Sequence, residues 1–255
     1  MDLGIRGRVA LVTGASSGIG EAVALALASE GAAVAVAARR RDLLEKVAIQ
    51  AKQRGAADAH AFEVDLDDPT AIQRLLADVR AALGDVTILV ANGGGPKPGK
   101  FLDLNFFDWD QGYRSTLRNM LELVHGVIPG MKSKGWGRIV ALTSSSVKQP
   151  IPTLALSNTF RTALVSALKT LSTEVARDGI TINSIATGRV LTDRLRHLYP
   201  DDEALHKAAE QEIPIGHVAT PEEYAPLVAF LCGQPASYVT GQTIAIDGGL
   251  IKGLF

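Results

Sequence analysis

The chain lacks the features that mark several classes of protein. It has one cysteine in 255 residues, which excludes an internal disulfide and suits a reducing compartment such as the cytoplasm. No run approaches the ~18 consecutive apolar residues that cross a bilayer, and the first residues do not form a basic segment followed by an apolar core. We therefore expect a soluble, cytoplasmic protein that neither spans nor binds a membrane.

Charge of one sign and metal-binding patterns are scarce as well. The 26 basic and 27 acidic residues nearly cancel, so there is no general attraction to nucleic acid. The five histidines are not spaced with other ligands as metal sites require; they are His60, His125, His197, His206 and His217. We expect that the protein binds no metal and that its partners are small molecules. We also expect a buried thiol at Cys232, which lies in an apolar helical run.

Short alanine-rich or β-branched runs alternate with longer helical patterns along the whole chain, as in parallel sheets covered by helices on both faces. The predicted strands are Val9–Thr13, Ala33–Ala38, Ala59–Val64, Val86–Ala91, Arg138–Thr143, Thr181–Ile185 and Thr243–Ile246. Predicted helices begin near Gly18, Asp42, Pro69, Phe107, Ser157 and Pro221. With no linker in view, residues 1–255 are predicted to form a single α/β domain, a Rossmann-type doubly wound sheet of about seven strands.

A glycine-rich turn joins the first predicted strand to the first helix. Gly14 permits a sharp exit from the strand, Gly18 lets the backbone approach a pyrophosphate, and Gly20 lets the helix pack closely on the sheet. The amides at the start of such a helix face an anion. The turn therefore predicts a dinucleotide site, and the alternative is a glycine-rich turn without a ligand.

The loop after the second strand carries basic residues. An NAD-preferring site would place an acid here, whereas this chain has Arg39 and Arg40, whose guanidinium groups suit a 2′-phosphate. This favours NADP(H) over NAD(H). The alternative is a solvated basic turn before Asp42, which would then cap the next helix.

Two further loops follow predicted strands. Asp65 and Leu66 follow the third, where Asp65 is a candidate to bond the adenine edge or, alternatively, to cap a helix. Asn92, Gly93 and Gly94 follow the fourth, where glycines let the backbone run close to a ligand. These residues join the candidate cofactor site.

Together these residues resemble the short-chain dehydrogenase/reductase family over essentially the whole chain, and within it the bacterial β-ketoacyl-acyl-carrier-protein reductases. The segments that carry the resemblance are Thr13–Gly20, Ala91–Gly94, Gly137–Val140, Thr143–Ser146, Asn183–Gly188, Thr192–Asp193 and Gly241–Gly249. The resemblance implies further cofactor contacts from Ser16, Ser17, Ile19, Arg161, Gly188, Val190 and Thr192.

The family's catalytic Tyr-x-x-x-Lys pair is replaced in this chain. Alignment on the flanking helical pattern puts Ser157 at the tyrosine position and Arg161 at the lysine position. Thr116 stands where the family's catalytic asparagine is expected, and Ser144 matches the catalytic serine. We predict that Ser144, Ser157 and Arg161 form the catalytic site. The alternatives are a turn cap at Ser144, a helix cap at Ser157 and an internal ion pair at Arg161.

An arginine has too high a pKa to serve as the acid, and a serine hydroxyl has little acidity near neutral pH. A water relay between Ser157 and Arg161 is one source of the proton. Lys148 and Tyr113 are two other candidate donors, with a solvated lysine and a packing tyrosine as the ordinary interpretations.

The preferred hypothesis is an NADP(H)-dependent oxidoreductase that interconverts a carbonyl and an alcohol, with an acyl thioester among the candidate substrates. One alternative is a catalytically inactive cofactor-binding homologue that acts as a sensor or partner subunit. Another is a non-redox enzyme of the same fold, such as a dehydratase or epimerase.

A lid and an oligomer are also expected. The resemblance implies a substrate lid near residues 189–214, whose apolar side chains include Leu195, Leu198, Tyr199 and Leu205. It also implies a homotetramer or homodimer. An apolar stripe supports that assembly, although such stripes commonly face the protein's own core; its members are Leu117, Met120, Leu121, Val124 and Ile128.

Overall fold

Seven parallel strands form one sheet in the computed structural model, which describes residues 1–68, 70–197 and 199–254. The strands are β1 (Val9–Thr13), β2 (Ala33–Ala38), β3 (Asp58–Glu63), β4 (Ile88–Ala91), β5 (Gly137–Leu142), β6 (Ile180–Thr187) and β7 (Thr243–Ile246). Their order is β3-β2-β1-β4-β5-β6-β7. Successive strands are therefore added first on one side of β1 and then, from β4 onward, on its other side. Ligands of doubly wound sheets bind at such a point, beyond the carboxyl ends of the strands.

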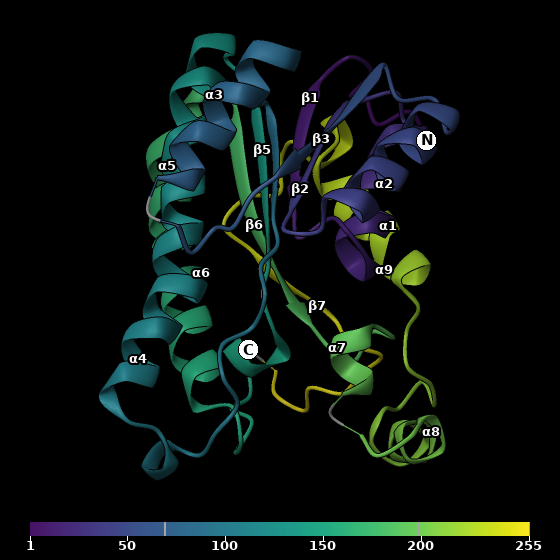
Figure 1. Ribbon diagram of the computed structural model, residues 1–255, viewed down its shortest axis with the longest axis vertical. Helices are drawn as coiled ribbons and strands as arrows, with labels where there is room; N and C mark the ends of the chain where they lie inside the picture. Colours follow the sequence, from purple (N-terminus) through teal and green to yellow (C-terminus); the bar gives the residue numbers. More distant parts are fainter. Residues whose placement is uncertain (69, 198, 255) are drawn as a thin grey trace.

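Helices cover both faces of the sheet (Figure 1). One layer contains α1 (Gly18–Ser29), α2 (Arg41–Gln53) and α9 (Pro221–Leu231), and the other contains α3 (Ala71–Leu83), α5 (Asn119–Lys134) and α6 (Ala155–Val175). Three more helical segments are α4 (Phe106–Tyr113), α7 (Asp193–Arg196) and α8 (Asp202–Glu212). Shorter turns are 3₁₀ at Phe101–Asp103, Ser145–Val147, Ala176–Asp178 and Gln234–Ala236, and π-helical at Arg114–Arg118.

The central strands β1, β2 and β4 are almost entirely apolar because both faces of the sheet are covered. In β1, Ala10 and Val12 pack into the core beneath α1 and α9, whereas Val9 and Leu11 pack into the core beneath α3 and α5. This alternation follows the two-residue period of a strand. Cys232 lies in the first of these cores, and burial raises the pKa of its thiol to about 12. The predicted buried thiol is thus confirmed.

The predicted fold is confirmed, with shifts at the ends of elements. β4 begins at Ile88 rather than Val86, and β6 extends to Thr187, which pairs with Ile246 of β7. α2 begins at Arg41 after an extended Arg40, so Asp42 lies inside the first turn and is not the predicted cap. α6 begins at Ala155, two residues before the predicted start.

Two expectations fall on positions outside the described residues: Pro69, as a helix start, and Leu198, as a lid residue. Within the described ranges, no group of three or more His, Cys, Asp or Glu side chains is placed to hold a metal ion. No helix in those ranges is both long and apolar enough to cross a membrane.

The predicted apolar stripe divides between two environments. Met120 and Val124 are buried in the core, as the alternative interpretation held. Leu121 and Ile128 are half-buried and line a groove with Leu171, between α5 and α6. Its apolar lining is bordered by charged side chains, among them Glu122, Lys132 and Glu174.

Candidate active site

The turn between β1 and α1 is shaped by glycine. A Cβ at Gly20 would overlap the carbonyl of Gly14, and a Cβ at Gly14 would lie 2.8 Å from Nδ2 of Asn92. Gly14 and Gly18 both have φ of 60°, which favours glycine. The N-cap residue of α1 is Ser17, and its side chain makes no capping hydrogen bond. The first backbone amides of the helix are therefore not bonded by this hydroxyl and can donate to a ligand. The turn is open to an anion.

Asn92 connects this turn to the end of β4. Its amide donates to Thr13 Oγ1 at 3.0 Å, and that hydroxyl donates to the Asn92 carbonyl at 2.7 Å. Asn92 Nδ2 also donates to the Gly14 carbonyl at 3.2 Å. The bonds hold the glycine turn against the loop after β4, at the change of direction in the sheet.

The basic loop after β2 reaches the same turn through Arg40. Its Nη2 donates to Ser16 Oγ at 3.0 Å and to Ser17 Oγ at 2.6 Å. Arg39 is exposed beside it. A positive group thus lies directly over the glycine turn. This is where the sequence predicts a 2′-phosphate.

The loop after β3 is a turn. Asp65 Oδ1 accepts from the Asp67 amide at 3.1 Å, and Asp67 Oδ1 accepts from Asn119 Nδ2 at 2.9 Å. Leu66 is partly buried and packs against the core. Asp65 is exposed, so its second oxygen is accessible to a ligand.

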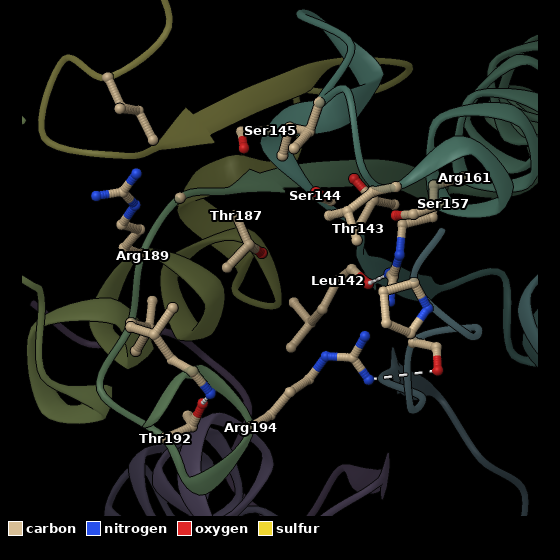
Figure 2. A pocket seen from close by; sticks show the side chains of 18 of the residues that line it. Leu142, Thr143, Ser144, Ser145, Ser157, Arg161, Thr187, Arg189, Thr192 and Arg194 are labelled. Atoms are coloured by element: carbon tan, nitrogen blue, oxygen red, sulfur yellow. Dashed lines mark hydrogen bonds between the residues drawn. The ribbon is translucent and has the colours of Figure 1, made fainter. Parts of the chain in front are cut away.

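A cavity of about 670 Å³ opens beyond the carboxyl ends of β4, β5 and β6 (Figure 2). Nine predicted site residues line it: Ile19, Asn92, Gly93, Ser144, Ser157, Arg161, Gly188, Val190 and Thr192. Ten others lie outside its lining, along the glycine turn and the neighbouring loops: Gly14, Ser16, Ser17, Gly18, Gly20, Arg39, Arg40, Asp65, Leu66 and Gly94. The first group surrounds the cavity, and the second lies along the path predicted for the cofactor.

Three hydroxyls gather at the end of β5. Ser144 Oγ accepts from the Ser146 amide at 3.1 Å, so Ser144 does cap the turn, but this bond uses a lone pair and leaves its hydrogen for a ligand. Ser157 Oγ lies 3.3 Å from Ser146 Oγ, and both side chains are buried. The α6 N-cap is Leu154, so Ser157 is not a helix cap.

Arg161 lies one helical turn after Ser157 on α6. Its Nη1 donates to the Leu142 carbonyl at 3.0 Å, and its Nη2 lies 3.5 Å from the Gly94 carbonyl. These are backbone contacts, and no carboxylate among the described residues forms the alternative ion pair with it. Burial and the nearby charge of Arg194 lower the pKa of Arg161 to about 10, so it stays cationic at neutral pH.

The predicted lid folds over the glycine turn. Thr192 caps α7 by accepting from the Leu195 amide at 3.3 Å, and a Cβ at Gly18 would lie 3.0 Å from its methyl group. From the same segment, Arg194 Nη1 donates to the Gly95 carbonyl at 3.3 Å, across the cavity mouth (Figure 2). Thr192 and Arg194 of the predicted lid thus bring it against the glycine turn and the loop after β4.

The chain matches a family model described as enoyl-(acyl carrier protein) reductase over residues 14–251. It is 32% identical to dehydrogenase/reductase SDR family member 4 from Oryctolagus cuniculus, covering 95% of this chain and 93% of the relative. It is also 32% identical to the 3-oxoacyl-[acyl-carrier-protein] reductase of Escherichia coli, covering 97% and 99%. This chain belongs to the short-chain dehydrogenase/reductase family.

Solved structures agree with this assignment. L-Sorbose reductase from Gluconobacter frateurii, complexed with NADPH and L-sorbose, superposes with a TM-score of 0.93 at 33% identity, and each chain is fully covered. An NADPH-bound short-chain oxidoreductase from Pseudomonas aeruginosa, described as containing an atypical catalytic center, superposes with a TM-score of 0.91 at 27% identity over 98% and 99% of the chains.

Of the two other candidate proton donors, Tyr113 lies away from the cavity. Tyr113 is exposed, packs on Phe160 at 6.2 Å between ring centroids, and lines the groove of α5 and α6. This position favours the ordinary interpretation of Tyr113 as a packing residue. Lys148 is partly buried and is not itself in the cavity lining, but it precedes the lining residue Gln149, and the buried Thr116 lies in the π-helical turn.

Two residues of the site were missed in the sequence. Ser146 was overlooked because it is the last of a serine run in which Ser144 alone carried the family motif. Arg194 lies two residues after the lid threonine, Thr192. Its hydrogen bond to the Gly95 carbonyl joins residues that are 99 positions apart in the sequence. A basic residue next to the lid motif was the available signal, although sequence spacing alone does not place it over a distant loop.

Proposed function

We propose that this protein is an NADP(H)-dependent oxidoreductase that interconverts a carbonyl and an alcohol through Ser144, Ser157 and Arg161. One observation carries the proposal: Ile19 and Asn92, from the glycine turn and the loop bound to it, line the same cavity as these three side chains. The names of the relatives, a sorbose reductase and an oxoacyl reductase, support carbonyl chemistry.

The glycine turn fits a dinucleotide. Its glycines leave bare backbone where a Cβ would collide, and the start of α1 offers amides to a diphosphate. Arg40, joined to Ser16 and Ser17, is placed for a 2′-phosphate and favours NADP(H). When bound, the nicotinamide supplies or accepts the hydride.

In this proposal, the cavity residues bind the carbonyl group and deliver a proton to its oxygen. Ser144 has a hydrogen to donate to the oxygen, and Ser157 forms a hydroxyl pair with Ser146. The cation of Arg161 stabilises negative charge that develops on that oxygen. The proton that completes the alcohol comes from water through the Ser146–Ser157 pair, since Arg161 holds its own proton at neutral pH.

A second candidate function is cofactor binding without turnover. It is favoured by the chemistry of the cavity lining, where serines and an arginine replace a phenol and an amine. A positioned acid typically contributes about 10²–10⁴-fold to the rate, so its absence slows a hydride transfer without forbidding it. The first proposal therefore stands ahead of the second.

The deciding experiment follows deuteride from labelled NADPH into a panel of ketones, aldehydes, keto acids, keto phosphates and 3-oxoacyl thioesters. We expect one or more deuterated alcohols, with kcat reduced by about 10²-fold in Ser157→Ala and in Arg161→Met. Thr162→Ala is the matched control on α6, because its exposed hydroxyl bonds only the Asn158 carbonyl. NADPH binding with no deuterated product from any member would overturn the proposal and support the second candidate.

We also propose a homodimer or homotetramer built on α5 and α6. The half-buried Leu121, Ile128 and Leu171 line the apolar groove between these helices. Burial of such a groove by a second copy would remove apolar surface from water. The corresponding test is given in the Discussion.

A further inference from the structure

The positive and negative charges of the residues that line the cavity do not cancel. The charged lining residues are Arg161, Arg189, Arg194 and Glu212. Glu212 forms an ion pair with Arg189, which leaves Arg161 and Arg194 without a carboxylate among the described lining residues. The cavity therefore carries two positive charges that its own acid does not neutralise.

The two arginines reach the cavity from different parts of the chain (Figure 2). Arg161 comes from α6, on the floor beside the Ser146–Ser157 pair, and Arg194 comes from the lid, exposed at the mouth. Both donate to the carbonyls of one loop, Arg161 to Gly94 and Arg194 to Gly95. A guanidinium has five N–H donors, so each keeps donors for a ligand.

Glycine makes room for the lid arginine. A Cβ at Gly95 would overlap Nη2 of Arg194, so the guanidinium rests on backbone that carries no side chain. Gly95 follows Asn92, which bonds the glycine turn, so Arg194 spans from the lid to the part of the cavity nearest that turn.

Two unneutralised guanidinium groups at one cavity favour an anion. Desolvation lowers the pKa of Arg194, and desolvation together with the charge of Arg194 lowers the pKa of Arg161. Each shift means that the folded protein disfavours the charged form. A bound oxyanion offsets this penalty through charge-assisted hydrogen bonds, and a cleft lined by one sign of charge attracts it.

We propose that the substrate carries an oxyanion, a carboxylate or a phosphate ester, in addition to its reacting carbonyl, and that Arg194 is the residue that selects it. The inference rests on the proposed function and names its substrate class. The carbonyl lies at Ser144 and Ser157, and the anionic group lies toward the mouth, within reach of Arg194. Uncharged carbonyl compounds of the same shape are poor ligands.

The test is calorimetric binding to the protein in the presence of NADP⁺, which requires no turnover. Two matched pairs serve as probes: 3-hydroxybutanoate against its methyl ester, and glycerol 3-phosphate against glycerol. We expect at least one anion to bind ten-fold or more tightly than its neutral partner. The pair that shows the difference identifies the carboxylate or the phosphate.

Substitution then assigns the effect to Arg194. Arg194→Gln is expected to weaken binding of the anion about ten-fold or more, with partial rescue in Arg194→Lys, and to leave the Kd for NADPH unchanged. Arg196→Gln is the matched control, because that lid arginine is exposed and faces Asp193 and Asp202. Circular dichroism confirms that each variant is folded.

Three outcomes overturn the inference: equal binding of charged and neutral partners, anion binding that survives Arg194→Gln, or a loss of NADPH affinity in that variant, which would assign the charge to the cofactor. Failure of the proposed function looks different. Anion binding that depends on Arg194, with no hydride transfer in the deuteride experiment, would remove the oxidoreductase and keep the anion site.

Discussion

Arg40 joins the basic loop after β2 to the glycine turn through its guanidinium, which donates to Ser16 and Ser17. A cation held at this point favours an extra phosphate on the adenosine ribose. Charge-assisted hydrogen bonds contribute about 1.5–3 kcal/mol each, enough to separate two cofactors by ten-fold or more. At the scale of one residue, we therefore propose that the preference for NADP(H) depends on Arg40, a side chain that the sequence indicates.

For Arg40→Ala, we expect the Kd for NADPH to rise about ten-fold or more while the Kd for NADH stays within about two-fold. Fluorescence titration with each cofactor measures both. Arg41→Ala is the control, because that neighbouring arginine pairs with Glu45 on the exposed face of α2. Equal weakening of both cofactors by Arg40→Ala would contradict a contact to the 2′-phosphate.

The charge of Arg161 is expected to favour ligand binding and to lower the stability of the folded protein. Its pKa in the folded protein is about 10, below the ordinary value of 12.5, so folding disfavours its charge. Below pH about 10 both the folded and the unfolded chain carry that charge, and the penalty is present in full. The penalty is relieved only as pH rises through the folded pKa.

Arg161→Met is therefore expected to raise the free energy of unfolding of the ligand-free protein by about 1–2 kcal/mol, after the loss of its bonds to the Leu142 and Gly94 carbonyls. The gain should be the same from pH 6 to pH 9. Urea unfolding across this range measures it. A variant that is less stable than the parent at every pH would show that Arg161 supports the fold and is not a strained functional group.

At the scale of elements, the β1–α1 corner depends on close approach of backbone to backbone. Gly20→Ala places a Cβ against the Gly14 carbonyl, so the corner must open. We expect a loss of NADPH binding of about ten-fold or more and a lower stability. Gly7→Ala serves as the control. Gly7 has a φ of 72°, and a Cβ there would meet no atom within 4 Å. This variant should lower stability and leave the NADPH affinity unchanged.

The elements themselves were largely predictable from the sequence. Both faces of the sheet are covered, so strands such as Val9–Thr13 and Ala33–Ala38 are continuous apolar runs with clear ends. The ends of helices were less certain, because α2 starts on an extended Arg40 without a side-chain cap. Periodicity reports burial and does not report which hydrogen bonds end an element.

The candidate site was predictable to a smaller extent. The glycine turn, Asn92 and Ser144 each follow a strand, and parallel strands bring such positions to one edge. The bond between Ser146 and Ser157 joins a turn to a helix, and the reach of Arg194 to Gly95 depends on the path of the lid. Long-range contacts of this kind depend on tertiary packing, which a local pattern does not encode.

At the scale of the whole molecule, the sheet supports the predicted cofactor path, the cavity and a separate groove. The first two lie at the carboxyl edge of the strands, and the groove is lined by residues of the helix layer that contains α5 and α6. Figure 1 shows these two helices on one face of the sheet. A surface that pairs two copies through this groove would leave both cavities open to solvent.

We expect Leu171→Arg to convert the assembled protein to a monomer, because a long charged side chain would replace apolar surface at the centre of the proposed interface. Light scattering on the eluted protein gives the mass. Ile49→Arg, on the exposed side of α2, should leave the mass unchanged. A monomer mass for the unmodified protein would contradict the proposed assembly.

The most direct test of the account is isothermal titration calorimetry of the unmodified protein with NADPH, NADP⁺, NADH and NAD⁺. Binding of one NADPH per chain is expected, tighter than NADH, because the glycine turn presents backbone amides to a diphosphate and Arg40 lies beside it. Absence of heat with all four cofactors, at protein concentrations where millimolar affinity is detectable, would contradict the claim that this corner holds a nicotinamide dinucleotide.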